Sequence, residues 1–112
     1  MAFTYNLSTP LGQVRLELGD TVLDQGPRPA KANFSDAEIT YFLEQEGNEV
    51  LLAVARACEV LSRQWSSAAD VQVGPRRESF SQVSAGYAAR ASGLRAQTIQ
   101  TGILVLGSAQ TG

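Results

Sequence analysis

The side chains best suited to chemistry are few in this chain of 112 residues, and histidine is absent. Without histidine, the chain has neither the usual general base near neutral pH nor a nucleophile–histidine pair. The single cysteine, Cys58, shares a helix-like face with leucine, valine and tryptophan side chains, so we expect a buried and unreactive thiol. These residue types predict a protein that is not an enzyme.

Among the residue patterns in the sequence, the acidic residues come closest to resembling a metal site. Asp20 and Asp24 have the spacing of a calcium loop, but that loop needs glycine where Gln25 stands and glutamate where Lys31 stands. The three glutamates between residues 44 and 49 crowd a predicted helix–helix turn and are expected to face solvent. The sequence also lacks a glycine-rich phosphate loop. We therefore expect no metal and no cofactor.

Basic residues keep nucleic-acid binding open as an alternative. Arg76 and Arg77 form a basic spot on a predicted loop, which would touch a DNA backbone or an acidic partner, unless the loop is simply exposed. A helix-turn-helix around Gly47 would place only Arg56 and Arg63 on its second helix, beside two glutamates. The net charge of −2 and the pI of about 5.0 argue against a dedicated DNA binder.

Charge is distributed unevenly along the chain. Residues 1–50 hold eight acids and three bases, whereas residues 51–112 hold three acids and six bases. Halves of opposite sign favour head-to-tail contact between copies. A solvated surface explains the same distribution equally well.

The first predicted element is a short helix. Thr9 is placed to cap it, Pro10 suits its first position, and Gly19 can end it. Its apolar stripe consists of Leu11, Val14 and Leu18. A long polar loop follows over residues 20–33, interrupted by proline and glycine.

The next two helices begin near residues 36 and 49. Ser35 with Glu38 forms a capping box, and Gly47 can end the second helix while Asn48 caps the third. Buried residues of the second helix are predicted to be Ile39, Phe42 and Leu43. The third helix, to about residue 68, has a core face of Leu51, Val54, Ala55, Cys58, Leu61 and Trp65.

A turn at Gly74 and Pro75, with a possible short strand over 71–73, precedes a fourth helix predicted over about 81–97. Its narrow stripe consists of Phe80, Val83, Tyr87, Ala91, Leu94 and Thr98. The rest of the chain is uncharged and β-prone at Ile103, Leu104, Val105 and Leu106. Such a tail can dock as a strand on a partner or remain a frayed end.

These signals together predict the fold class. We expect a mainly α protein, a small four-helix bundle with a long loop after the first helix and a short turn or hairpin before the last. Residues 1–99 would form the helical domain, and residues 100–112 an extended C-terminal docking tail. No aliphatic run is long enough to span a membrane, and no secretory signal is evident, so no membrane partner is expected.

The order of these segments resembles a known family. The relevant stretches are residues 11–16, 18–21, 34–39, 52–59 and 91–95, of which the glycine-aspartate-threonine loop and the following Phe34–Ile39 segment are the most telling. Together they resemble the head–tail connector, or adaptor, proteins of long-tailed bacteriophages. The similarity extends over about residues 5–99.

The resemblance implies a structural role in the neck of a virion, after assembly in the host cytoplasm. Such a subunit forms a homo-oligomeric ring, with twelve copies expected, that joins the portal protein to the stopper or tail-completion protein. DNA passes through its channel without sequence-specific binding. The partner-binding residues would be Ile103, Leu104, Val105 and Leu106 in the tail, with Arg76 and Arg77. The alternatives are a small helix-turn-helix regulator and another virion or tail-assembly factor.

Overall fold

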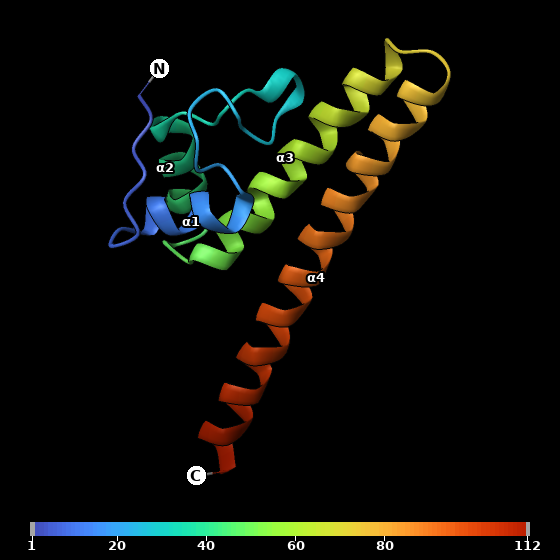
Figure 1. The fold of residues 1–112 in the computed structure, drawn as a ribbon. Helices are drawn as coiled ribbons and strands as arrows, with labels where there is room; N and C mark the ends of the chain where they lie inside the picture. Colours follow the sequence, from blue (N-terminus) through green and yellow to red (C-terminus); the bar gives the residue numbers. More distant parts are fainter. Residues whose placement is uncertain (1, 112) are drawn as a thin grey trace.

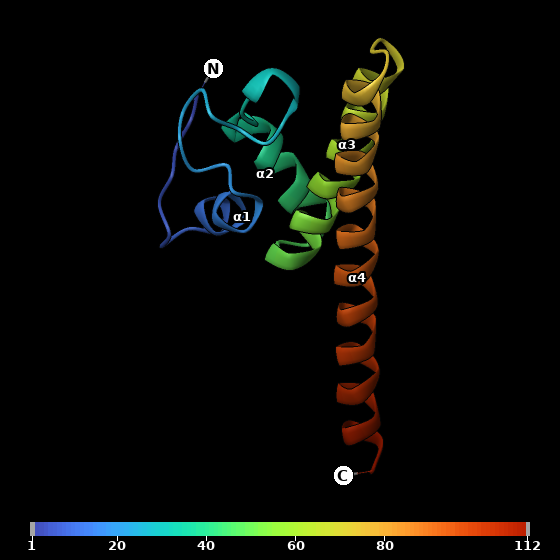
Figure 2. The same ribbon diagram turned by 45° about the vertical axis from the view of Figure 1, so that its right-hand side comes forward.

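The computed structural model describes the backbone of residues 2–111 and the side chains of residues 2–98. It contains four α-helices and no strand within the described backbone: α1 (Pro10–Leu18), α2 (Asp36–Gln45), α3 (Val50–Asp70) and α4 (Pro75–Thr111), with a short 3₁₀ turn, η1 (Pro29–Lys31). Helix α3 lies between α1 and α2 on one side and α4 on the other (Figures 1 and 2). The predicted mainly α, four-helix fold is confirmed.

Helix α1 begins and ends where the sequence predicts. The Thr9 hydroxyl accepts a hydrogen bond from the Gly12 N–H at 3.1 Å, and Pro10 occupies the first turn. Gly19 adopts a φ of 75°, a left-handed conformation that glycine reaches without steric cost. Its N–H donates to the carbonyls of Arg15 and Leu16, which satisfies the end of the helix.

Helix α2 has the predicted capping box. The Glu38 N–H donates to the Ser35 hydroxyl at 3.1 Å, and the Ser35 N–H donates to Glu38 Oε1 at 2.8 Å. Two backbone donors that a helix start leaves unpaired are thereby satisfied. The predicted buried residues are confirmed as Ile39, Phe42 and Leu43.

The core is built around α3, which contacts every other helix. Its fully buried side chains include Ala53, Val54, Ala57, Cys58 and Leu61, which meet Val14, Leu18 and Phe34 from the N-terminal part. One predicted core residue is wrong. Leu51 is 41% exposed, because it lies in the first turn of α3 at the edge of a surface groove.

Helix α4 runs antiparallel to α3 and packs through the middle of its predicted stripe. Ala91 is buried, and Tyr87 and Leu94 pack against the core. Near the turn, Phe80 meets Trp65 edge to face with ring centroids 5.0 Å apart. Val83 was expected in this contact but is 36% exposed. Val83 lies in a shallow surface depression with Gly86, Tyr87 and Arg90, so its side chain is only partly covered.

Two predicted boundaries and one predicted strand are wrong. Helix α3 continues to Asp70, residues 71–73 form no strand, and α4 starts at Pro75 rather than near residue 81. Gly74, at a φ of 70°, makes the turn, and proline suits the first helical position because it lacks the N–H that would be unpaired there. Asn48 does not cap α3. The cap residue is Glu49, whose side chain makes no capping bond.

The C-terminal segment was expected to be extended, but its backbone continues α4 to Thr111 (Figure 1). After Thr98 the chain contains no proline and no charged residue. Extending an existing helix gains one backbone hydrogen bond for each added residue, whereas an isolated strand gains none. Helix α4 therefore runs past the start of α3, where Thr98 and Val50 face the same groove.

Candidate functional site

The basic spot predicted from sequence lies at one end of the molecule. Arg76 and Arg77 are exposed in the first turn of α4, next to the turn that joins α3 and α4. Neither guanidinium forms a hydrogen bond or ion pair within the described side chains. The side chains are exposed, as predicted, but the predicted loop is wrong because both residues lie in the first turn of α4, and a partner for these arginines remains a prediction.

The other predicted partner-binding residues are Ile103, Leu104, Val105 and Leu106. Their backbone lies in α4, but their side chains are outside the described part of the structure. The turn and this segment lie at opposite ends of the molecule (Figure 1). The structure therefore does not bring the two sets of predicted residues into one site.

A buried charge network is the main polar centre of the described structure. Arg15 is fully buried, and its guanidinium contacts Asp20 at 2.7 Å and Asp36 at 2.8 Å. The same group donates to the carbonyls of Thr4 at 2.7 Å and Phe34 at 3.0 Å. One side chain thus joins the N-terminal segment, α1, the long loop and the start of α2.

Asp20 is the buried acceptor of this network. Its Oδ2 also receives the Phe34 N–H at 3.1 Å, and its Oδ1 receives the side-chain amide of Asn33 at 2.6 Å. Because both carboxylate oxygens are occupied, Asp20 has little capacity left for a cation. No group of acids and thiols able to hold a metal occurs among the described residues.

The N-terminal segment, residues 3–6, covers the network, and we call it the strap. Thr4 donates to Asp36 through its N–H at 2.7 Å and its hydroxyl at 2.6 Å, and the Phe3 ring lies 4.0 Å from the Arg15 guanidinium. Burial works to raise the pKa of Asp36, but the hydrogen bonds from Thr4 and Arg15 outweigh it and lower the pKa. A side chain on Gly12 would collide with the backbone of Asn6, so the strap needs glycine there.

A second, more exposed charge cluster ties α4 to the rest of the chain. Arg95 contacts Glu59 of α3 at 2.8 Å and Glu46, at the end of α2, at 3.3 Å. Arg56 contacts the same Glu46 at 2.8 Å. Hydrogen bonds from Arg95 lower the pKa of Glu59. For Glu46, burial acts to raise the pKa, but the two arginines lower it.

This cluster bears on the helix-turn-helix alternative. Of the two arginines that α3 would offer to DNA, Arg56 is already bound to Glu46, and Arg63 is exposed without an ion pair among the described residues. A recognition helix normally presents several side chains to phosphates and base edges. The observed α2–α3 corner supplies few of these contacts.

Cys58 is buried, as predicted, where α3 meets α4. Burial raises the pKa of its thiol, with Arg90 opposing this effect and Glu59 adding to it. The neighbouring Tyr87 hydroxyl also has a raised pKa because of burial. A thiol that is held protonated in an apolar contact is a poor nucleophile.

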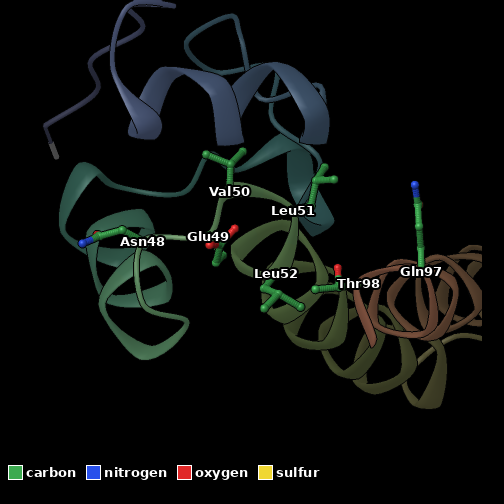
Figure 3. A pocket seen from close by; sticks show the side chains of 7 residues that line it. All are labelled: Asn48, Glu49, Val50, Leu51, Leu52, Gln97 and Thr98. Atoms are coloured by element: carbon green, nitrogen blue, oxygen red, sulfur yellow. The ribbon is translucent and has the colours of Figure 1, made fainter. Parts of the chain in front are cut away.

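A surface groove opens at the corner where α3 begins. It encloses about 600 Å³ and is lined by Glu49, Val50, Leu51 and Leu52 of the α3 start and by Gln97 and Thr98 of α4 (Figure 3). Most of these α3 side chains are aliphatic. Asn48 also lines the groove, but its aliphatic part suits an apolar protein segment better than a small polar ligand.

Sequence reasoning identified the caps of α1 and α2 and missed the role of Arg15. A charged residue at the fifth position after Pro10 gives no sign of burial, and its partners stand 5 and 21 residues further on. The available signal was the glycine-aspartate pair at residues 19 and 20, which places an acid where the helix ends. Only the folded chain shows that Arg15 points toward it.

No protein-family model, curated protein or solved structure matches this chain. Within the described residues, no helix combines the length and the apolar character that a bilayer span requires.

Proposed function

We propose that this chain is a structural subunit of a bacteriophage neck, which forms a ring between the portal at the capsid vertex and the stopper or tail. The observation that carries the proposal is the shape. Helices α1, α2 and α3 form a small unit, which we call the head, and the long helix α4 packs on it and continues beyond the start of α3 (Figures 1 and 2). A projecting helix of this kind gives a subunit a surface for partners outside its own core.

The sequence resemblance supports the same role. The segments that carry it contain Arg15, Asp20 and Asp36, which meet in the buried network, and Ser35 with Glu38, which start α2. A family pattern whose separate pieces meet at one structural centre is easier to explain than a chance match. The network fixes the head as a rigid unit, and rigid units are what a ring requires of its subunits.

The described residues do not form a recognisable catalytic site. We therefore propose a function that depends on contacts with other molecules. The buried polar atoms there are all hydrogen-bonded within the chain. The exposed apolar side chains and the corner groove are what remain for contact with other molecules.

Sedimentation with the purified portal protein of the same virus tests the proposal. We expect the chain to bind portal and electron microscopy of the complex to show a ring that lengthens the channel. Deletion of residues 101–112 should weaken this binding while the melting of the isolated chain changes little. Absence of binding to portal would refute the role.

The same samples test the alternatives. A salt-dependent shift of duplex DNA would favour a helix-turn-helix regulator. Binding to a tail component without binding to portal would favour another tail-assembly factor. A variant with Arg63 substituted serves as a control in the DNA assay, because Arg63 is the exposed arginine on α3.

A further inference from the structure

The turn between α3 and α4 has more exposed apolar surface than a turn needs. Val73 is 86% exposed and Val71 is 78% exposed, the highest values among the large hydrophobic side chains that the structure describes. Only Gly74, with its positive φ, is required by the turn itself. Two uncovered valines beside two arginines have no structural role inside this chain. We call residues 71–77 the tip.

The charges of the tip also work against local stability. Arg76 and Arg77 lie in the first turn of α4, where the helix dipole presents partial positive charge. Cations there are unfavourable, and these two arginines have no acidic partner within the described side chains. The neighbouring Asp70 and Glu78 are exposed as well but make no ion pair with them. Arginine is a residue type enriched in protein interfaces.

A complementary surface lies at the other end of α3. The corner groove has aliphatic walls from Val50, Leu51 and Leu52, and Glu49 at its lining. Glu44 precedes the same corner in the last turn of α2, where the dipole presents partial negative charge, so this acid too is unfavourably placed. Glu46 is bound by arginines, but neither Glu44 nor Glu49 makes an ion pair within the described residues.

We propose that the tip of one copy docks in the corner groove of a second copy. Val71 and Val73 would enter the aliphatic groove, and Arg76 and Arg77 would pair with Glu44 and Glu49. The occupant is another copy because the chain itself carries both halves, with opposite charge and a shared apolar centre. The contact would pair Arg76, Arg77 and Glu44, whose charges are unfavourable at their own helix ends, with charges of opposite sign.

The geometry makes this contact head-to-tail. Tip and groove are separated by the length of α3, whose 21 residues span about 30 Å. The tip of a chain therefore cannot reach its own groove, and each copy offers one tip and one groove. Such a heterologous contact generates a ring when the rotation closes. The inference rests on the proposed function in this respect, since it names the contact that joins neighbours in the ring.

Charge reversal in the full chain tests the contact. The tip variant carries Arg76→Glu and Arg77→Glu, and the groove variant carries Glu44→Arg and Glu49→Arg. All four positions are exposed, so circular dichroism should show both variants folded like the wild type. Sedimentation velocity over a range of concentrations then measures self-association. We expect each variant alone to associate more weakly by roughly tenfold or more, because like charges meet.

The decisive sample is the mixture of the two variants. There the acidic tip meets a basic groove and the basic tip meets an acidic groove, so association should return to near the wild-type level. Arg63→Glu, which reverses an exposed charge on α3 away from both surfaces, should leave association unchanged. Rescue in the mixture is not expected for an interface elsewhere on the chain.

Three results would overturn the inference: a wild-type chain that stays monomeric at every concentration, variants that associate like the wild type, or a mixture without rescue. A groove variant that loses only portal binding would also overturn it, by assigning the groove to portal. Portal binding by the wild type is measured separately. A failure of the tip contact therefore leaves the proposed neck function to be judged by its own assay.

Discussion

Substitution of Arg15 by methionine removes the centre of the buried network while keeping a long side chain. Two carbonyls, of Thr4 and Phe34, would lose their donor. The buried carboxylate of Asp20 would keep only its bonds from Asn33 and the Phe34 N–H. Asp36 is partly exposed and can be rehydrated, so the main cost falls on Asp20.

The magnitude follows from the burial of both partners. The side chains of Arg15 and Asp20 are each 0% exposed, and loss of one partner from such a pair costs about 3–5 kcal/mol. A domain of this size has a total stability on the order of 5–15 kcal/mol. The substitution should therefore lower the urea midpoint by more than about 1 M without changing the slope of the transition.

The matched control is Arg90→Met. Arg90 pairs with Glu17 at 3.7 Å, and both side chains are well exposed, so its loss should cost no more than about 1 kcal/mol. Urea unfolding followed by circular dichroism compares the two variants. If Arg15→Met shifts the midpoint no more than Arg90→Met does, the network does not hold the head together.

Three further changes test other contacts. Ser35→Ala should cost about 1 kcal/mol of unfolding free energy in the same urea assay, and an unshifted midpoint would show that the cap is unimportant. Because the folded-state pKa values of Glu46 and Glu59 are lowered, their contribution to stability is present above the ordinary pKa of 4.5 and is lost as pH falls through the lower folded values. Arg95→Gln should flatten this part of the stability–pH curve, and an unchanged curve would contradict the assignment. Cys58 should react slowly with a thiol reagent in the native chain and rapidly in denaturant, and equal rates would place the thiol at the surface.

The starts of α1 and α2 were predictable because their signals are local. Ser35 and Glu38 stand three residues apart, and the capping box depends on nothing else. The four-helix fold and the buried face of α2 likewise follow from spacing along a single helix. Cys58 could be placed in the core for the same reason.

The remaining features depend on contacts between distant segments. Leu51 and Val83 have the spacing of core residues, but each lies at the margin of its helix contact and no neighbour covers it. The buried role of Arg15 needs Asp36, which is 21 residues away in sequence. The corner groove needs residues of α3 and α4 that are separated by more than forty positions, so periodicity within one helix cannot reveal it.

The position of Cys58 beneath α4 has a consequence for the kinetics of this protein. Helix α4 packs mainly on α3, with an exposed ion pair from Arg90 to Glu17 of α1, and Ala91 is its one buried side chain in the described part. A terminal helix whose contacts are mostly partly buried side chains can open at a lower free energy than the core of a domain. Because the thiol lies in the α3–α4 contact, a reagent reaches it when α4 lifts away. The rate of native labelling at Cys58 therefore measures how often this hairpin opens, and a partner that clamps α4 would be detected as a slower reaction at a residue it never touches.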